Sequence, residues 1–209
     1  MDNSTLTYYQ KNAAELARRY EQAEVPDLHL ALQKTFPAAS RLLEIGCGTG
    51  REASFMYSRG YDIICIEPSR PMLEEALCRH PELENRLFEG YVPGKLPEDL
   101  NTGESYDGVY AVASLMHLQQ KELAPVFKLI RKLLKPGGGF LFSVPLSRPD
   151  LIESGYDTVG RFFLLISEDE WICRLEEAGF RNIRTASNPD GMGRGSITWL
   201  TCVGEKYQD

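Results

Sequence analysis

The sequence lacks a long hydrophobic run, a cluster of basic residues and a closely spaced pair of cysteines. No apolar segment approaches the roughly 20 residues that a membrane-spanning helix needs, and the N-terminus lacks a signal pattern. The 23 basic and 30 acidic residues are interleaved and give a net charge of −7, a surface that repels phosphate backbones. We therefore expect neither membrane association nor a nucleic acid partner.

The cysteines form an odd set of five without a CxxC spacing, and most of them lie in apolar segments. A disulfide framework or a zinc site would need paired spacings. Buried reduced thiols are typical of cytoplasmic proteins. We expect a cytoplasmic protein with no metal site, and the sequence makes no prediction of oligomeric state.

What is present is a regular alternation of strand-like and helix-like segments, with no repeat or linker between them. The 209 residues suffice for one core, so we expect a single domain over residues 1–209. A helical cap is expected over residues 1–38, with Asp27 capping its second helix, and a core over residues 40–205. Strands are expected at 41–45, 62–67, 85–90, 106–114 and 139–145, with helices beginning near 51, 71 and 120. Continuous Ile, Leu and Val runs suit parallel strands buried on both faces, which indicates a doubly wound α/β sheet with helices on both faces.

The last third of the chain departs from this alternation. Ser167, followed three residues later by Glu170, predicts the capped start of a helix that Gly179 ends. Two strand segments follow at 180–186 and 196–204, with only a loop between them. Because no helix connects them, they should pair antiparallel as a hairpin.

The segment RLLEIGCGTGREA, residues 41–53, places Gly46, Gly48 and Gly50 directly after an apolar strand. Glycines permit close ligand approach, and the following helix N-terminus presents free N–H groups. Glu67 ends the next strand, where a carboxylate can accept hydrogen bonds from both ribose hydroxyls of a nucleoside. The alternative is an ordinary tight turn between a strand and a helix.

Two nucleoside cofactors use such a loop. The dinucleotide fingerprint needs glycine or alanine at position 51, where this chain has Arg51. The loop instead reads E-x-G-x-G-x-G from Glu44 to Gly50. Glu44 would repel a pyrophosphate and tolerate a cationic amino-acid moiety, so the pattern favours S-adenosylmethionine over NAD.

Five segments in order resemble those of class I S-adenosylmethionine-dependent methyltransferases of the compact small-molecule type. They are LLEIGCGTG, IICIEPSRPML, YDGVYAVASLMHL, LLKPGGGFLFSV and LEEAGF with ITWLTCVGEK, from about Ser40 to Glu205. The resemblance implies a Rossmann-like, seven-stranded mixed sheet ordered 3-2-1-4-5-7-6 with the last strand antiparallel. It also implies an enzyme that moves a methyl group from S-adenosyl-L-methionine to a small-molecule acceptor by in-line displacement, leaving S-adenosyl-L-homocysteine.

By position, the resemblance implies that the glycine loop contacts the amino-acid moiety of the cofactor and that Glu67 binds its ribose. Tyr8 and Tyr9 match tyrosines that close over the methionine end. Tyr91 stands where the family often has an aspartate for the adenine amine, so backbone around Tyr91 or its ring must hold adenine. The expected cofactor-binding residues are Tyr9, Glu44, Gly46, Cys47, Gly48, Gly50, Glu67, Pro68, Ser69, Met72, Tyr91, Val92, Ala111 and Ser114.

The acceptor side rests on fewer signals. His117 follows the fourth strand at the switch point of the sheet and is a candidate general base, with helix packing as the alternative; Tyr8 is a second catalytic candidate. The long segment 146–169 either carries function or only packs over the fifth strand. Its expected substrate-binding residues are Arg148, Tyr156, Arg161 and Phe162. Because arginine pairs with carboxylates, we expect a small, partly apolar acceptor that carries an anion near Arg161.

Two other functions remain open at this point. A non-catalytic S-adenosylmethionine-binding regulatory protein would keep the glycine loop and lose the acceptor pocket. An NAD-dependent oxidoreductase is disfavoured by Arg51 and by the terminal hairpin. We also expect Gly46→Val to abolish cofactor binding in a folded protein, because its side chain would occupy the ligand's space.

Overall fold

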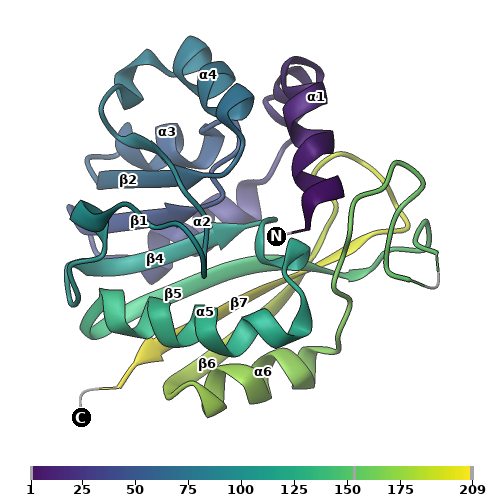
Figure 1. Ribbon diagram of the computed structural model, residues 1–209. Coiled ribbons are helices and arrows are strands. Elements are labelled where there is room, and N and C mark those ends of the chain that lie inside the picture. Colours follow the sequence, from purple (N-terminus) through teal and green to yellow (C-terminus); the bar gives the residue numbers. More distant parts are fainter. Residues whose placement is uncertain (1, 153, 208–209) are drawn as a thin grey trace.

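Seven strands form one sheet in the order β3-β2-β1-β4-β5-β7-β6 in the computed structural model, which describes residues 2–152 and 154–207 (Figure 1). The strands are β1 (Arg41–Ile45), β2 (Asp62–Glu67), β3 (Leu87–Glu89), β4 (Tyr106–Val112), β5 (Leu134–Ser147), β6 (Phe180–Pro189) and β7 (Thr198–Lys206). β1 to β5 run parallel, and β7 pairs antiparallel with both β5 and β6. The predicted fold class and strand order are confirmed.

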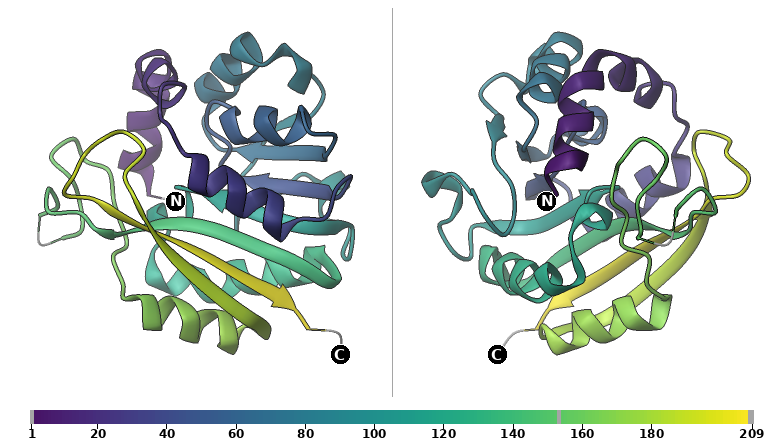
Figure 2. Two further views of the ribbon diagram at one scale, coloured as in Figure 1. Left: turned by 180° about the vertical axis from the view of Figure 1, so that it is seen from behind. Right: turned by 45° about the vertical axis from the view of Figure 1, so that its right-hand side comes forward.

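Helices cover both faces of this sheet (Figure 2). The α-helices are α1 (Asn3–Tyr20), α2 (Pro26–Thr35), α3 (Arg51–Tyr57), α4 (Arg70–Arg79), α5 (Gln120–Leu133) and α6 (Glu168–Glu177). Short 3₁₀ helices are η1 (Pro81–Leu83), η2 (Glu98–Leu100) and η3 (Leu115–His117). One buried cluster joins α5 and α6 to the sheet, and a second joins α2 and α3 to its other face. The apolar runs of the strands are thus covered on both sides.

α1 lies apart from these layers and packs on α4. Ala13 and Leu16 of α1 form a small buried cluster with Met72 of α4. The helix begins after Asp2, whose side chain accepts from the N–H groups of Ser4 and Thr5. This position brings α1 over the carboxyl ends of the central strands, where open α/β sheets bind ligands (Figure 1).

Three local predictions need correction. Asp27 does not cap α2, because the helix already begins at Pro26 and Asp27 lies in its first turn. β5 begins at Leu134 and not at residue 139, because Leu134 pairs with Tyr106 across a register shift. Cys47, Cys65 and Cys202 are buried as expected, whereas Cys78 and Cys173 are exposed.

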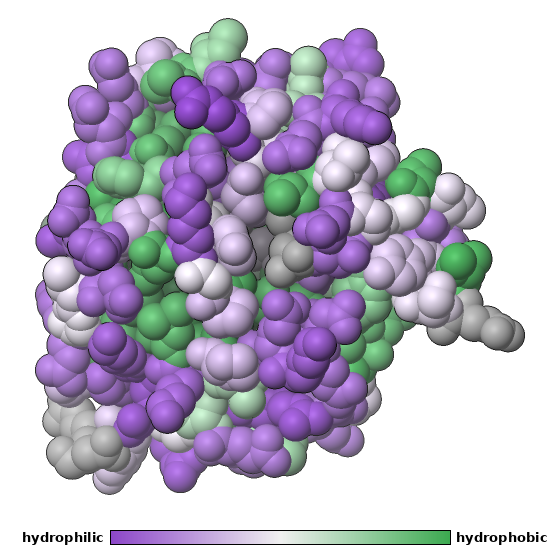
Figure 3. Space-filling view, viewed as in Figure 1, coloured by the Kyte–Doolittle hydropathy of each residue, from purple (hydrophilic) through white to green (hydrophobic). Residues whose placement is uncertain are grey.

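None of the helices in the described part of the chain is long and apolar enough to cross a bilayer. Figure 3 shows hydrophilic residues over much of this face, with hydrophobic residues between them on its left half and on the projection at its right-hand side. Among residues 2–152 and 154–207, no three His, Cys, Asp or Glu side chains are grouped so that they could hold a metal ion.

Candidate functional site

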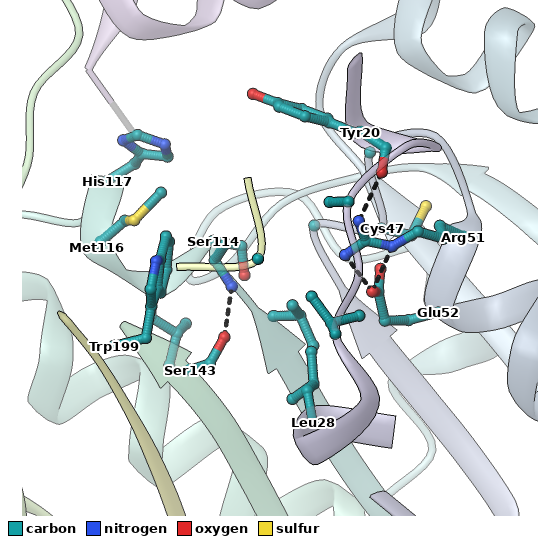
Figure 4. A pocket seen from close by; sticks show the side chains of 18 of the residues that line it. Tyr20, Leu28, Cys47, Arg51, Glu52, Ser114, Met116, His117, Ser143 and Trp199 are labelled. Atoms are coloured by element: carbon teal, nitrogen blue, oxygen red, sulfur yellow. Dashed lines mark hydrogen bonds and ion pairs between the residues drawn. The ribbon is translucent and has the colours of Figure 1, made fainter. Parts of the chain in front are cut away.

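A cavity of about 450 Å³ lies at the carboxyl ends of β1, β2 and β4. Its walls come from α1, the glycine loop, the lid segment (residues 148–166) and the β6–β7 loop (residues 190–197). Figure 4 shows Trp199, Met116 and His117 along one side of the cavity and Cys47, Arg51 and Glu52 along the other. Elements far apart in the sequence therefore meet at one site.

The glycine loop shapes the floor of the cavity, and each of its glycines has a different neighbour. A Cβ on Gly46 would lie 2.5 Å from Cβ of Ser114, so protein atoms already require glycine there. A Cβ on Gly50 would meet Leu83 at 3.0 Å, and Gly50 does not line the cavity. Gly48 is different: a Cβ there would approach only the terminal methyl of Met72, at 3.6 Å. Gly46 and Gly48 both line the cavity, but of the two only Gly48 has no close protein neighbour at its Cβ position, so a side chain there would enter the space that a ligand can use.

Glu67 ends β2 beside this loop, and its side chain is buried. Its two carboxyl oxygens accept from backbone N–H groups, Oε2 from Gly48 at 3.0 Å and Oε1 from Ser69 at 2.9 Å. Burial raises the pKa of Glu67 to about 7, even though both hydrogen bonds favour the charged form. The two hydrogen bonds thus fix the orientation of the carboxyl group, and a further donor would lower its pKa.

Glu44 and Arg51 form the neighbouring wall. Burial raises the pKa of Glu44 well above its usual range, and the carboxyl accepts from the hydroxyl of Tyr110 at 3.1 Å. Arg51 binds the carboxylate of Glu52 and donates to the backbone carbonyl of Tyr20 at 2.6 Å (Figure 4). The residue that breaks the dinucleotide fingerprint therefore joins the end of α1 to the start of α3.

Tyr9 and His117 meet at the upper side of the cavity. The Tyr9 hydroxyl lies 2.9 Å from Nε2 of His117, and Nδ1 of the same ring lies 2.6 Å from the carbonyl oxygen of Phe162. A carbonyl only accepts, so Nδ1 carries the proton and Nε2 accepts from Tyr9. Burial lowers the pKa of His117 to about 4 and raises that of Tyr9 well above its usual range. Both groups are neutral at physiological pH.

The lid segment holds a buried arginine, Arg148, and a partly buried one, Arg161, each paired within the segment itself. Arg148 binds Asp150 at 2.5 Å and stacks on Phe163, 4.0 Å from the ring centre. Arg161 binds Asp157 at 2.6 Å and lies 4.8 Å from the ring centre of Tyr8. Both arginines line the cavity, but their charges are already compensated.

The β6–β7 loop forms a further wall of the cavity. Asp190 accepts five hydrogen bonds there, from the backbone N–H of Met192, from Arg194 three times and from Nε1 of Trp199. Burial alone would raise the pKa of Asp190, but these donors hold it well below its usual range. The loop is also fastened to the α1–α2 connection, since Glu24 N–H donates to the carbonyl of Gly191 at 3.1 Å.

A family model described as a methyltransferase domain matches residues 17–185, which is most of the chain. The chain belongs to the class I S-adenosylmethionine-dependent methyltransferases. The observed strand order is the one that the resemblance to this family led us to expect from the sequence.

Individual methyltransferases and their structural relatives are distant. The ubiquinone biosynthesis O-methyltransferase of Xanthomonas axonopodis pv. citri (strain 306) is 26% identical over 208 residues, 94% of this chain and 79% of the relative. Phosphoethanolamine N-methyltransferase 2 of Haemonchus contortus has a TM-score of 0.75 at 19% identity, covering 100% of this chain and 61% of that chain. The [4+2]-cyclase SpnF has a TM-score of 0.73 at 16% identity, covering 97% and 95%. The chain spans 38–45% of the length of three other curated relatives. One fold thus serves several reactions.

The structure brings most of the expected cofactor residues of this methyltransferase to the cavity. Those that line it are Tyr9, Glu44, Gly46, Cys47, Gly48, Glu67, Pro68, Met72, Tyr91, Val92 and Ser114. Gly50, Ser69 and Ala111 do not: Gly50 packs against η1, Ser69 caps α4, and Ala111 is buried within the core. The structure gives these three residues structural roles, and their expected ligand contacts stay predictions.

Three residues expected on the acceptor side also lie outside the cavity lining. Tyr8 is turned toward Arg161, while Tyr156 and Phe162 pack against each other with ring centres 5.4 Å apart. Sequence reasoning did not place Trp199 and Asp190 at the site, although both line the wall formed by the β6–β7 loop and β7. The only signal for this wall was the cluster of Asn, Pro, Asp and Gly before the last strand, which indicated a loop and not its position.

Proposed function

We propose that the protein transfers the methyl group of S-adenosylmethionine to a small-molecule acceptor that shares the cavity. The observation that carries the proposal is the bare backbone of Gly48, which faces the cavity and donates to the buried carboxyl group of Glu67. A nucleoside can lie against this backbone and donate its ribose hydroxyls to Glu67. When bound, S-adenosylmethionine supplies a methyl group on a sulfonium, which is already activated for displacement.

The remaining cofactor contacts follow from the cavity walls. Pro68, Met72, Tyr91 and Val92 form the side next to Glu67 and are suited to adenine, with the exposed ring of Tyr91 as a movable cover. Glu44 lies on the other side of the glycine loop, where an ammonium group would favour its ionised form. These residues fit the two ends of the cofactor.

A small acceptor fits the remaining walls. Met116, Phe163 and Trp199 are apolar or aromatic, and the cavity is bounded by the lid segment and the β6–β7 loop. A carboxylate on the acceptor would have to displace Asp157 from Arg161, so the structure does not favour the anionic acceptor that the sequence suggested. We propose a partly apolar acceptor that is neutral where it meets this wall.

The pKa of His117 narrows the chemistry further. A histidine with a pKa of about 4 is a weak base, so it would assist little in removing a proton from an alcohol. A neutral amine or a thiolate needs no such help. We therefore propose an amine or thiol acceptor, with His117 and Tyr9 orienting it and with the lid segment and the β6–β7 loop limiting the access of water.

The test begins with binding and ends with turnover. We expect S-adenosylmethionine and S-adenosylhomocysteine, but not NAD, to raise the melting temperature of the protein. Gly48→Ala should remove most of this shift, because its methyl group enters the ligand space. Gly60→Ala is the matched control, since Gly60 also has a positive φ but a Cβ at that position would meet no atom within 4 Å.

Turnover separates the enzyme from a binding protein. A panel of small amines and thiols should yield methylated product with S-adenosylhomocysteine in equal amounts. Cofactor binding without any turnover would favour the regulatory alternative, and stabilisation by NAD would contradict the proposal as a whole.

A further inference from the structure

A chain of hydrogen bonds runs from the N-terminus of α1 to the hydroxyl of Tyr9 by way of the lid segment. The Thr5 hydroxyl donates to Asp2 at 3.2 Å and accepts from the backbone N–H of Phe162 at 2.9 Å. The carbonyl of Phe162 accepts from Nδ1 of His117 at 2.6 Å, and Nε2 accepts from Tyr9 at 2.9 Å. Thr5 and Tyr9 lie four residues apart on one face of α1, so the chain returns to the helix from which it starts.

The backbone of Phe162 determines which group donates and which accepts in the hydrogen bonds of His117. Its carbonyl is a pure acceptor, which requires the proton of a neutral imidazole to be on Nδ1. Nε2 then has a lone pair, and the Tyr9 hydroxyl must donate to it. If the carbonyl moved away, the proton could sit on Nε2 and the Tyr9 hydroxyl would turn its hydrogen toward the cavity.

Thr5 fixes Phe162 from the other side of the residue. The Thr5 side chain is fully buried, and its oxygen is the acceptor for the Phe162 N–H. Ser4 adds a second link, from its hydroxyl to the carbonyl of Gly160 at 2.8 Å. The lid segment is thus attached to α1 next to the residue that contacts His117.

We propose that Thr5 is a positioning residue, which acts through the backbone of Phe162 to select the Nδ1–H tautomer of His117 and so the direction of the Tyr9 hydroxyl. Its consequence for catalysis rests on the proposed function, whereas the tautomer itself does not. A hydroxyl that donates to His117 keeps the lone pairs of its oxygen, which Tyr20 also approaches. That oxygen can accept a hydrogen bond from the N–H of a neutral amine acceptor, whose own lone pair remains available for the methyl group.

The charged groups around the ring are fixed parts of the same region. Arg161 and Arg148 act against protonation of His117, and Asp157 acts in favour of it. The ring of Phe163 packs on the imidazole with centroids 4.9 Å apart. Within residues 2–152 and 154–207, Tyr9 and Phe162 are the two hydrogen-bond partners of this ring.

The test is nitrogen-15 NMR of the imidazole rings in the full chain without ligand. The sequence has three histidines, so three sets of ring signals are expected, and His117→Asn assigns the relevant one. We expect the Nδ1–H tautomer in the wild type and in Thr5→Ser, which keeps the hydroxyl. Thr5→Val keeps the size but removes the acceptor, and should convert a large share of His117 to the Nε2–H tautomer. Thr7→Val is the matched control, because the Thr7 hydroxyl lies on the same helix and donates only to Asn3 of α1.

Four outcomes of the NMR experiment decide the inference, and the tautomer found in the wild-type protein is by itself enough to contradict it. An Nε2–H tautomer in the wild type, an unchanged tautomer in Thr5→Val, or an equal change in Thr7→Val contradicts the proposal. If Thr5→Val does not fold, Thr5→Ala removes the same oxygen with less bulk and is read in its place. A tautomer that shifts in the valine variant and is restored in the serine variant supports it.

The activity readout is separate from the tautomer. Once an acceptor is known, we expect Thr5→Val to lower kcat by roughly tenfold or more, with the Kd for S-adenosylhomocysteine within about twofold of the wild type. If the tautomer shifts while kcat is unchanged, the positioning is correct and the proposed role of Tyr9 in methyl transfer is wrong.

Discussion

At the scale of single residues, Glu67 has the property that is easiest to measure. Its pKa of about 7 results from burial, and its carboxyl already accepts two backbone hydrogen bonds. Ribose hydroxyls would donate to the ionised form and stabilise it. Ligand binding should therefore be coupled to loss of a proton from Glu67.

The sign of this coupling gives a prediction for the affinity of S-adenosylhomocysteine. Below pH 7 the carboxyl is mostly protonated and must be ionised on binding, so affinity should rise by up to about tenfold per pH unit and level off above pH 7. Glu67→Gln cannot ionise, so its affinity should be weaker by ~1.5–3 kcal/mol at pH 8, or roughly ten- to a hundredfold. Calorimetry between pH 5.5 and 8 measures both. A wild-type affinity that is independent of pH, or the same slope in both proteins, would contradict the assignment.

Gly46 and Gly48 show what one sequence can and cannot predict at this scale. The motif E-x-G-x-G-x-G correctly predicted a loop beside a ligand-sized cavity, because three glycines after a strand allow close approach. It could not distinguish which glycine faces the ligand. A Cβ on Gly46 would lie 2.5 Å from Cβ of Ser114, so loss of binding in Gly46→Val stays a prediction that would not separate a clash with the ligand from a clash within the protein. The distinction depends on Ser114, a residue far from Gly46 in the sequence that lies beside it in the fold.

At the scale of elements, the β6–β7 loop is held by one buried carboxylate. Asp190 binds Arg194 at 2.6 Å and Trp199 at 2.9 Å, and its side chain is almost fully buried. Trp199 belongs to β7, so Asp190 joins the loop to the strand that follows it. Asp190 is therefore the main side-chain support of the wall that this loop provides, beside the backbone hydrogen bond from Glu24 to Gly191.

Replacing that side chain should loosen the loop and leave the cofactor half of the cavity intact. We expect Asp190→Asn to destabilise the protein by roughly 2 kcal/mol, because buried donors lose a charged acceptor. Hydrogen exchange should become faster in residues 188–201, while calorimetry gives an unchanged affinity for S-adenosylhomocysteine. Glu205→Gln is the control, since it breaks an exposed pair with Arg184 between the same strands. Equal effects in the two variants, or a large loss of cofactor affinity in Asp190→Asn, would contradict this role.

Elements were predictable where local pattern and tertiary structure agree. β1 and β2 begin and end at the predicted residues, because both are continuous apolar runs buried on both faces. The hairpin of β6 and β7 followed from the missing helix between them. The lid segment was identified by its length, but its internal pairs were not, because sequence spacing does not say that Arg161 will face Asp157 and not a ligand. The link between Thr5 and Phe162 crosses most of the chain and has no local signal.

At the scale of the whole molecule, both ends of the described chain form walls of one cavity. Tyr9 and Tyr20 of α1 lie on one side, and Trp199 and Thr201 of β7 lie on the other. β7 is also inserted between β5 and β6 and pairs with both along most of its length. The last strand in the sequence is therefore an interior strand of the sheet.

We expect a chain that stops at Gly195 to lose far more than one strand. β5 would have an unpaired edge and β6 would lose β7, the strand with which it pairs, and unpaired strands promote association between chains. The cavity would also lack Trp199 and Thr201. Light scattering should show that the truncated chain aggregates. S-adenosylhomocysteine should no longer raise the melting temperature of this truncated chain. A monomeric truncated chain that still binds the ligand would contradict this account.

The interior position of β7 also sets the order of events during biosynthesis. As the ribosome releases the chain from the N-terminus, the glycine loop and Glu67 emerge early, but their cavity has no far wall until residues 198–206 have followed. Until β7 is in place the pocket lacks Trp199 and Thr201, so we expect the ligand to bind only after residues 198–206 have been made.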